Sequence, residues 1–250
     1  NILTRIEAFH KAFACKRRSS GLPRNIEQCL RDYDIPLYLS HTVTDILGKE
    51  RLEGVVVSQV DERMQPIPGT EKTWACDTLI LSVGLIPENE LSLGAGVVLD
   101  GRSKGAIVDE HYQTNVDGIF AAGNVLHVHD LVDFVSEEAA AAGKHAAAYV
   151  KGESRPGSGR RITMNPTGGV RYTVPSTIDP ERMENELTVR FRAGAVFKNC
   201  YVSVYFDQER VIRRRRQIVA PGEMEEIRLT KEQLSQHADL KIITVTIEEA

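Results

Sequence analysis

The stretch GIFAAGNVLHVHDLVDF, residues 118–134, places three features in a fixed order. A short apolar run ends at Gly123 and Asn124, a polar segment with two histidines follows, and an alanine-rich segment begins after it. Glycine has no Cβ, so a ligand can approach the backbone closely at Gly123. An ordinary strand, turn and helix would give the same pattern, and the rest of the chain must distinguish the two interpretations.

The segment DFVSEEAAAAGKHAAAYV, residues 133–150, is typical of a helix with very small side chains. We expect Asp133 as its N-cap and Glu137 and Glu138 in its first turn, where acidic side chains favour the helix dipole. Such a helix can lie very close to a sheet or to a cofactor. The high helix propensity of alanine is the other explanation of this composition.

Two motifs in the same region carry a family resemblance. TNVDGIFAAGN, residues 114–124, resembles the T-x-x-x-G-[IV]-[FY]-A-x-G-D signature of the pyridine nucleotide-disulphide oxidoreductase superfamily, which are flavoproteins with two dinucleotide-binding domains. Upstream, CDTLILSVGLIPENEL, residues 76–91, resembles the strand of the same family that ends in G-x-x-P-N, with Glu88 as an extra residue before Asn89. The two motifs and the small-residue helix occur in the family's order and cover roughly residues 20–150.

The resemblance implies FAD as cofactor and NAD(P)(H) as co-substrate, and it assigns residues to cofactor binding. Asn124 stands where the family has an aspartate that touches the ribityl chain of FAD. An amide can donate to and accept from a hydroxyl, but it removes one negative charge. Backbone N–H groups at the helix N-terminus would favour negative charge on the reduced flavin. The residues implied in cofactor binding are Gly84, Pro87, Gly123, Asn124, Phe134, Val135 and Ser136.

A G-x-G-x-x-G fingerprint is missing from the chain, whose only G-x-G pairs are Gly94 with Gly96 and Gly157 with Gly159. A complete member of the family carries two such fingerprints, one for each dinucleotide. We therefore expect the end of an NAD domain and the closing part of an FAD domain, as a fragment of a longer protein that is inactive alone. The first residue, Asn1 rather than Met, agrees with this expectation.

The insert VLHVHDLVD, residues 125–133, raises the question of chemistry at its histidines. No third ligand cluster accompanies the H-x-H-D sequence, so we predict no metal site. Imidazole titrates near neutral pH, which makes His129 and His127 the candidate catalytic residues for substrate protonation. Ordinary hydrogen-bonded loop histidines are the alternative interpretation.

Composition limits the class of protein. The 250 residues are 42% hydrophobic and 26% charged, which is ordinary for a soluble globular chain. The formal net charge of -4 provides no general attraction for nucleic acid or for an anionic membrane. No apolar run approaches the ~20 residues that a membrane span requires. The four cysteines are scattered and form no C-x-x-C pair, which suits a reducing cytosol and predicts a cytoplasmic location.

The composition changes at KGESRPGSGRR, residues 151–161, which is typical of a linker. We expect a partial Rossmann-like FAD/NAD(P)-binding α/β region over 1–152, a linker over 153–162 that few contacts cross, and a small all-β, immunoglobulin-like sandwich over 163–250. In the third part apolar residues alternate, with Leu187, Val189 and Phe191 on one face. RRRR, residues 213–216, is interpreted as a solvated sheet edge and not as a nucleic-acid site.

Other elements follow from local patterns. We expect helices over 6–18 and 23–34, extended segments over 35–48 and 53–61, a strand buried on both faces over 76–84, and short strands over 105–110 and 118–123.

The sequence therefore favours part of an FAD-dependent oxidoreductase that exchanges hydride with NAD(P)(H) and acts on a small molecule or a redox partner protein. An oligomer or a partner subunit is compatible with this prediction. The alternative is a non-catalytic docking or assembly subunit built on a remnant of a nucleotide-binding fold.

Overall fold

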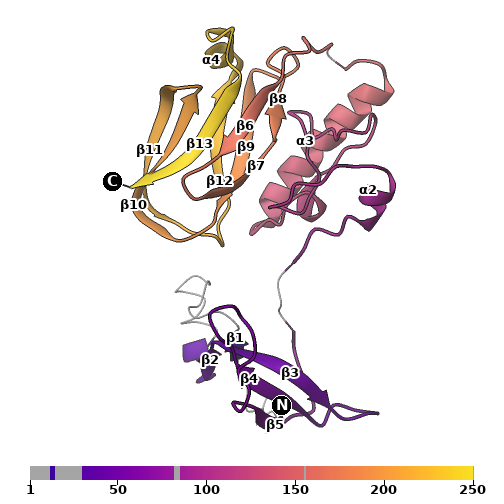
Figure 1. Ribbon diagram of the computed structural model, residues 1–250. Coiled ribbons are helices and arrows are strands. Elements are labelled where there is room, and N and C mark those ends of the chain that lie inside the picture. The colour runs from indigo at the N-terminus through magenta and orange to yellow at the C-terminus, as the bar shows by residue number, and fades with distance from the viewer. Residues whose placement is uncertain (1–11, 15–29, 82–84, 155, 250) are drawn as a thin grey trace. The chain divides into compact units, whose positions relative to one another are not determined.

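The computed structural model describes residues 12–14, 30–81, 85–154 and 156–249 (Figure 1). The chain forms two compact units, residues 1–83 and residues 84–250, and each is considered by itself. Both units mix strands with turns, and the described helices of four residues or more lie in the second unit. The fold is therefore of mixed α and β structure.

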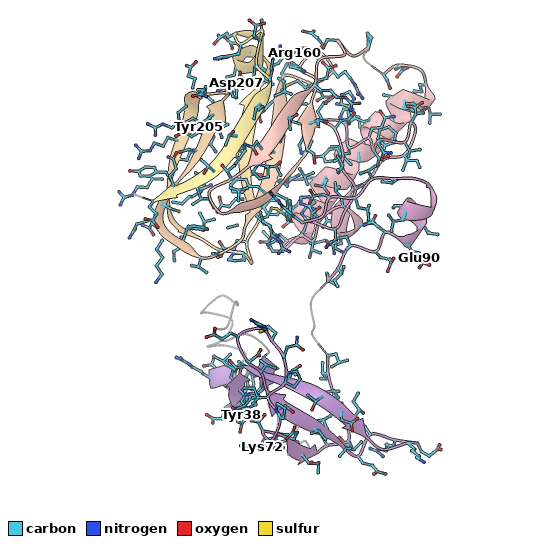
Figure 2. The ribbon with its side chains drawn as sticks, in the orientation of Figure 1. Tyr38, Lys72, Glu90, Arg160, Tyr205 and Asp207 are labelled. Atoms are coloured by element: carbon cyan, nitrogen blue, oxygen red, sulfur yellow. The ribbon has the colours of Figure 1, made fainter. Side chains whose placement is uncertain are left out.

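The first unit is built from short strands. β3 (His41–Leu47), β4 (Gly54–Gln59) and β5 (Lys72–Ala75) form an antiparallel sheet in that order, with buried valines on β4. β1 (Ala12–Ala14) pairs in parallel with β2 (Leu37–Leu39). The ring of Tyr38 lies 5.8 Å from that of Trp74 (Figure 2). The extended segments expected over 35–48 and 53–61 are confirmed.

Two sequence predictions in this unit are wrong where the structure describes the residues. A helix was expected over 6–18, but 12–14 form β1, because pairing with β2 outweighs a weak helical preference. The strand expected over 76–84 is not a strand at 76–81, where Ile80 is 84% exposed. No described strand lies beside it to fix its backbone. The helix expected over 23–34 falls mainly outside the described residues.

The second unit begins with a segment of loops and helices: α2 (Glu90–Gly94), the single turn η2 (Gly123–Val125) and α3 (Val132–Val150). The strands expected over 105–110 and 118–123 are reduced to the isolated bridges Leu99–Ala106 and Gln113–Phe120. A short apolar run forms a ladder only when a neighbouring strand pairs with it, and the described residues supply none here. The Rossmann-like arrangement of this region stays a prediction.

Two sheets follow in the same unit. The five-stranded sheet has the order β11-β10-β13-β6-β8, and the three-stranded sheet has the order β12-β9-β7. The strands expected from the alternating pattern are confirmed, and so is the position of the arginine run on an edge strand. The elements are β6 (Ile162–Pro166), β7 (Val170–Val174), β8 (Thr177–Ile178), β9 (Glu186–Ala193), β10 (Phe197–Phe206), β11 (Glu209–Val219), β12 (Glu225–Thr230), α4 (Lys231–Ser235) and β13 (Ile242–Glu249).

One buried cluster draws side chains from both sheets. Val189 and Phe191 of the smaller sheet and Val204 and Ile243 of the larger sheet are all fully buried in it. The alternation of Leu187, Val189 and Phe191 toward the core is therefore confirmed. An immunoglobulin-like connection of the strands is not established and stays a prediction.

Side-chain contacts fix the turns of this part. Asp207, at the turn between β10 and β11, accepts a hydrogen bond from the backbone N–H of Ile242 at 3.0 Å (Figure 2). Arg160, which precedes β6, donates to the carbonyl of His237 at 2.7 Å (Figure 2). These bonds join segments that are far apart in the sequence.

Contacts across the expected linker are numerous, so the expectation that few would cross it is wrong. A register shift lies between Val170 and Tyr172 of β7. Val170 belongs to the core between the sheets, whereas Tyr172 and Val174 belong to a second cluster with Leu126 and residues of α3. A bulge redirects side chains to the other face of a strand, which explains this division. Figure 1 shows α3 lying alongside β7 and β8.

No described helix combines the length and the apolar character that crossing a bilayer would require.

Candidate functional site

Gly123 occupies the turn that the sequence singled out, and its geometry requires glycine. Its φ is +70°, in the left-handed region that other residues rarely adopt. A Cβ at this position would lie 3.3 Å from Cγ1 of Val135, a side chain of α3. The turn and the helix are therefore in close contact, and the turn keeps its backbone unobstructed.

Asn124, the next residue, is exposed, and its side chain closes the loop that leads to α3. Its Oδ1 accepts a hydrogen bond from the backbone N–H of His129 at 3.1 Å. The amide therefore has a structural partner in addition to the cofactor contact implied by its position. An aspartate would preserve the same acceptor atom.

The two sequence motifs lie side by side. Asn89 is buried, and its Nδ2 donates to the carbonyls of Lys104 at 3.1 Å and Val125 at 2.9 Å. A Cβ on Gly105 would lie 1.6 Å from the carbonyl oxygen of Leu126, so this backbone crossing also needs glycine. The half-buried Pro87 belongs to the same segment, and Gly84 lies outside the described residues.

The start of α3 differs in detail from the expectation. Its N-cap is Leu131 with no side-chain cap, Asp133 lies in the first turn, and Glu137 and Glu138 follow in the second. An α-helix leaves its first four N–H groups without a partner in the helix. By this geometry the N–H of Phe134 has no partner within the helix, whereas those of Val135 and Ser136 bond within it.

Glu138 is the centre of a buried polar cluster that joins the turn to the helix. Its Oε1 accepts from the backbone N–H of Gly123 at 2.7 Å and lies 3.1 Å from Nε2 of His129. Its Oε2 lies 2.7 Å from Nε2 of His127. The Nη1 of Arg190, from β9, is 4.0 Å from the same oxygen, and its Nη2 bonds Glu137 at 2.8 Å.

The electrostatics of the cluster favour a charged Glu138 carboxylate and a neutral His127 imidazole. Burial acts to raise the pKa of Glu138, but the hydrogen bonds from His127, His129 and Gly123 outweigh burial and lower this pKa to about 2. Burial lowers the pKa of His127, and the neighbouring Glu138 only partly opposes that effect. Each imidazole then donates through Nε2, and Nδ1 of both rings has no partner among the described residues.

The structure brings the rings of His127 and His129 together below the surface, with centroids 4.4 Å apart. Their side chains are 0% and 1% exposed. Sequence reasoning missed Glu138 as their common partner, since an acidic residue near a helix start is ordinarily explained by the helix dipole. It missed Arg190 too, because strand alternation assigned this residue only to the face opposite Phe191.

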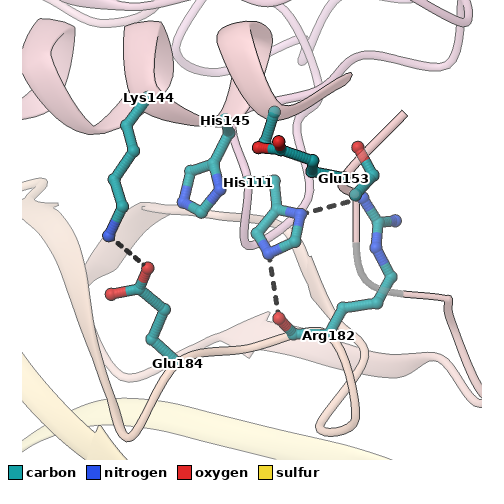
Figure 3. A pocket seen from close by; sticks show the side chains of 8 residues that line it. His111, Lys144, His145, Glu153, Arg182 and Glu184 are labelled. Carbon is teal, nitrogen blue, oxygen red and sulfur yellow. Dashed lines mark hydrogen bonds and ion pairs between the residues drawn. The ribbon is translucent and has the colours of Figure 1, made fainter. Parts of the chain in front are cut away.

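A second polar group lines a small cavity of about 100 Å³ beside α3 (Figure 3). Nη2 of Arg182 donates to Nδ1 of His111 at 3.1 Å, and Nε2 of His111 donates to the Arg182 carbonyl at 2.9 Å. The ring of His145 stacks on that of His111 with centroids 3.9 Å apart. The pKa of His145 is lowered to about 4, mainly by burial and secondly by the neighbouring His111. No sequence motif indicated this pair.

Comparison with known proteins gives the family. The profile of the pyridine nucleotide-disulphide oxidoreductase family matches residues 6–146, more than half of the chain. A soluble pyridine nucleotide transhydrogenase of Vibrio atlanticus is 29% identical over 164 residues, which are 60% of this chain and 33% of that protein. A thioredoxin reductase of Listeria innocua is 31% identical over 100 residues, which are 40% of this chain and 29% of that protein.

Among solved structures, the thioredoxin reductase of T. acidophilum is 24% identical, with a TM-score of 0.46 over 57% of this chain and 44% of that one. The chain spans about a third of the length of the curated relatives that it matches. The family match covers both sequence motifs, the Gly123 turn and most of α3. The chain thus belongs to the pyridine nucleotide-disulphide oxidoreductases, a family of flavoproteins that use FAD and NAD(P)(H).

Proposed function

We propose that the chain is part of an FAD-dependent oxidoreductase that exchanges hydride with NAD(P)(H), and that its Gly123 turn and the start of α3 contact the flavin. The observation that carries this proposal is the family match over residues 6–146. The substrate is a small molecule or a redox partner protein.

The described residues fit a dinucleotide at this place. Gly123 offers a backbone without a Cβ, Asn124 offers an exposed amide, and α3 begins without a side-chain cap. Uncapped N–H groups and the positive end of the helix dipole attract negative charge. The N–H of Phe134 is the donor that we assign to this role, and Val135 and Ser136 contribute the surface beside it.

FAD, when bound, supplies the hydride chemistry. The contributions of this chain are to orient the flavin against the turn and to stabilise negative charge near α3. Oε1 of Glu138 accepts a hydrogen bond from the Gly123 N–H at 2.7 Å, and this bond fixes the backbone of the turn against the helix. Asn124 would hold a hydroxyl of the ribityl chain.

The proposed role of His127 and His129 in substrate protonation requires a route to rings that are now buried. In the structure both Nε2 atoms face Glu138. We keep this role as a separate proposal. It predicts that His129→Gln lowers turnover with substrate without changing reduction of the flavin by NAD(P)H.

The flavin content of the full-length protein tests the proposal. We expect about one FAD per chain, released on denaturation and identified by chromatography. A full-length protein that is colourless and takes up no added FAD would overturn the assignment. Reconstitution of the 250-residue chain alone is not the test, since the sequence lacks the glycine-rich fingerprints.

A further inference from the structure

Three ligand-type atoms converge below the surface between η2 and α3. They belong to His127, His129 and Glu138, whose ligand atoms all lie within 4.8 Å of one another. The two histidines come from one short loop and the glutamate from the second turn of α3. Their side chains are at most 1% exposed, so this is an enclosed site.

The backbone of the loop is held in place by bonds that do not involve the imidazole rings. The N–H groups of Leu126 and His127 both donate to the carbonyl of Gly123, at 2.9 and 3.0 Å. Arg192 donates to the carbonyl of Val128, between the two histidines, at 2.8 Å. The rings therefore reach the carboxylate because the loop places them there. Surrounding contacts that orient the ligands in this way strengthen metal binding.

The donor set identifies the class of ion. Two imidazole nitrogens and one carboxylate oxygen suit Zn²⁺ and related divalent transition metals. Mg²⁺ and Ca²⁺ require about six or more oxygen ligands, which this enclosed cluster does not offer. The second oxygen of Glu138 or a water molecule would complete a four-coordinate sphere.

The neighbouring charges permit a cation. The positive charge of Arg190 opposes a bound cation. Its Nη2 lies 2.8 Å from Glu137, however, whereas its Nη1 lies 4.0 Å from Glu138, so the guanidinium pairs mainly with Glu137. Two carboxylates thus face one guanidinium, which leaves a net negative charge. Arg192 is also offset, by Asp130 at 3.3 Å.

In the hydrogen bonds to Glu138, the imidazoles of His127 and His129 each use only Nε2. Both Nδ1 atoms are buried without a partner among the described residues. A neutral imidazole can carry its proton on either nitrogen. Transfer of that proton from Nε2 to Nδ1 frees both Nε2 lone pairs for an ion, with no proton lost from either ring.

We propose that His127, His129 and Glu138 form a binding site for a divalent transition-metal ion of the zinc type, which ties the Gly123 turn to α3. The site does not depend on the proposed redox function. It departs from the sequence prediction of no metal at H-x-H-D, because that prediction did not include Glu138 as the third ligand. Its role is structural, since the ligands are enclosed and no described cavity opens onto them. A bound ion would occupy both imidazoles, so this proposal and substrate protonation by His127 or His129 exclude each other.

Cobalt binding tests the site directly. The 250-residue chain, made without a histidine tag and stripped with a chelator, is titrated with Co²⁺ and observed by visible absorption, followed by competition with Zn²⁺. We expect one Co²⁺ per chain, displaced by Zn²⁺, and a higher Tm of the loaded protein. Absence of any cobalt spectrum from the wild-type chain would overturn the proposal.

Matched variants locate the ion. Glu138→Gln keeps an acceptor for the Gly123 N–H, and His129→Gln removes one ring; each is expected to weaken binding about 100-fold or more. His145→Gln, on the same helix but outside the cluster, should bind as the wild type does. Equal binding by all the variants would refute the site. If a variant fails to fold, X-ray absorption of the zinc-loaded wild type decides: two imidazoles with oxygen donors support the site, and any other ligand set overturns it.

Discussion

Asn124 accepts a hydrogen bond from the His129 N–H through Oδ1, and we propose that its exposed amide also contacts the cofactor beside Gly123. In the full-length protein we expect Asn124→Leu to weaken FAD retention by ~1–3 kcal/mol, because leucine can pair neither with this N–H nor with a cofactor hydroxyl. Flavin remaining after dialysis, measured by absorbance, checks the prediction. Asn124→Asp, which keeps the acceptor, should retain FAD, and unchanged occupancy in the leucine variant would mean that the position is misassigned.

Glu110 gives a second prediction at the scale of single residues, through pH. Its Oε2 accepts from the N–H of Asp179 at 2.8 Å, and its surroundings include Asp109, His111 and the guanidinium of Arg182. Burial, followed by the charge of Asp109, raises the pKa of Glu110 from 4.5 to about 7. The folded protein therefore holds this proton over a pH range in which the unfolded chain has released it.

The stability contributed by protonated Glu110 is complete below pH ~4.5 and is lost as the pH rises through ~7. Glu110→Gln removes the titration, so we expect its Tm relative to the wild type to increase between pH 5 and pH 8. The free-energy change is on the order of 3 kcal/mol. Glu90→Gln, an exposed substitution on α2, is the control. A Tm difference that stays constant with pH would show that Glu110 is already ionised in the folded protein.

At the scale of elements, two glycines have opposite environments. A Cβ at Gly143, within α3, has nothing within 4 Å, so Gly143→Ala should stabilise the protein by ~0.5–1 kcal/mol through helix propensity. A Cβ at Gly105 would overlap the Leu126 carbonyl at 1.6 Å. Gly105→Ala should destabilise by ~1–3 kcal/mol or more, as overpacking does. Urea unfolding measures both, and a neutral Gly105→Ala would contradict the close crossing of these two segments.

The elements also show which predictions from sequence were reliable. Period-two alternation located β9, β10, β12 and β13 because each of these strands has a buried face and a more open one within the chain itself. The apolar runs at 76–84 and 118–123 predicted strands that the described residues do not form, since pairing depends on neighbours that local sequence does not specify. The turn at Gly123 and the alanine-rich helix α3 are present as predicted, and the cofactor-binding role of Gly123 and Asn124 stays a prediction.

The rest of the site could not be predicted from sequence. Arg190 reaches Glu137 from 53 residues along the chain, and the rings of His111 and His145 stack although more than 30 residues separate them. No local pattern encodes such contacts.

At the scale of the molecule, the position of the domain boundary is open to test. The larger buried cluster uses only residues from Ile162 onward, whereas the smaller one combines residues 97–142 with Tyr172 and Val174. We expect residues 156–250 to unfold cooperatively on their own, with a lower Tm than residues 84–250. The Tm is lower because Tyr172 and Val174 of β7 lose their contacts with residues 97–142. Residues 84–154 alone should not fold. Circular dichroism during heating checks this, and a fragment 156–250 without a cooperative transition would contradict it.

The most direct test of the flavoprotein assignment is anaerobic titration of the full-length protein with NADH and NADPH, observed through the flavin absorption bands. We expect a yellow protein whose flavin absorption bleaches on addition of at least one of the two nucleotides and returns when oxygen is admitted. A protein that holds FAD but is bleached by neither nucleotide, or one that holds no flavin, would contradict it.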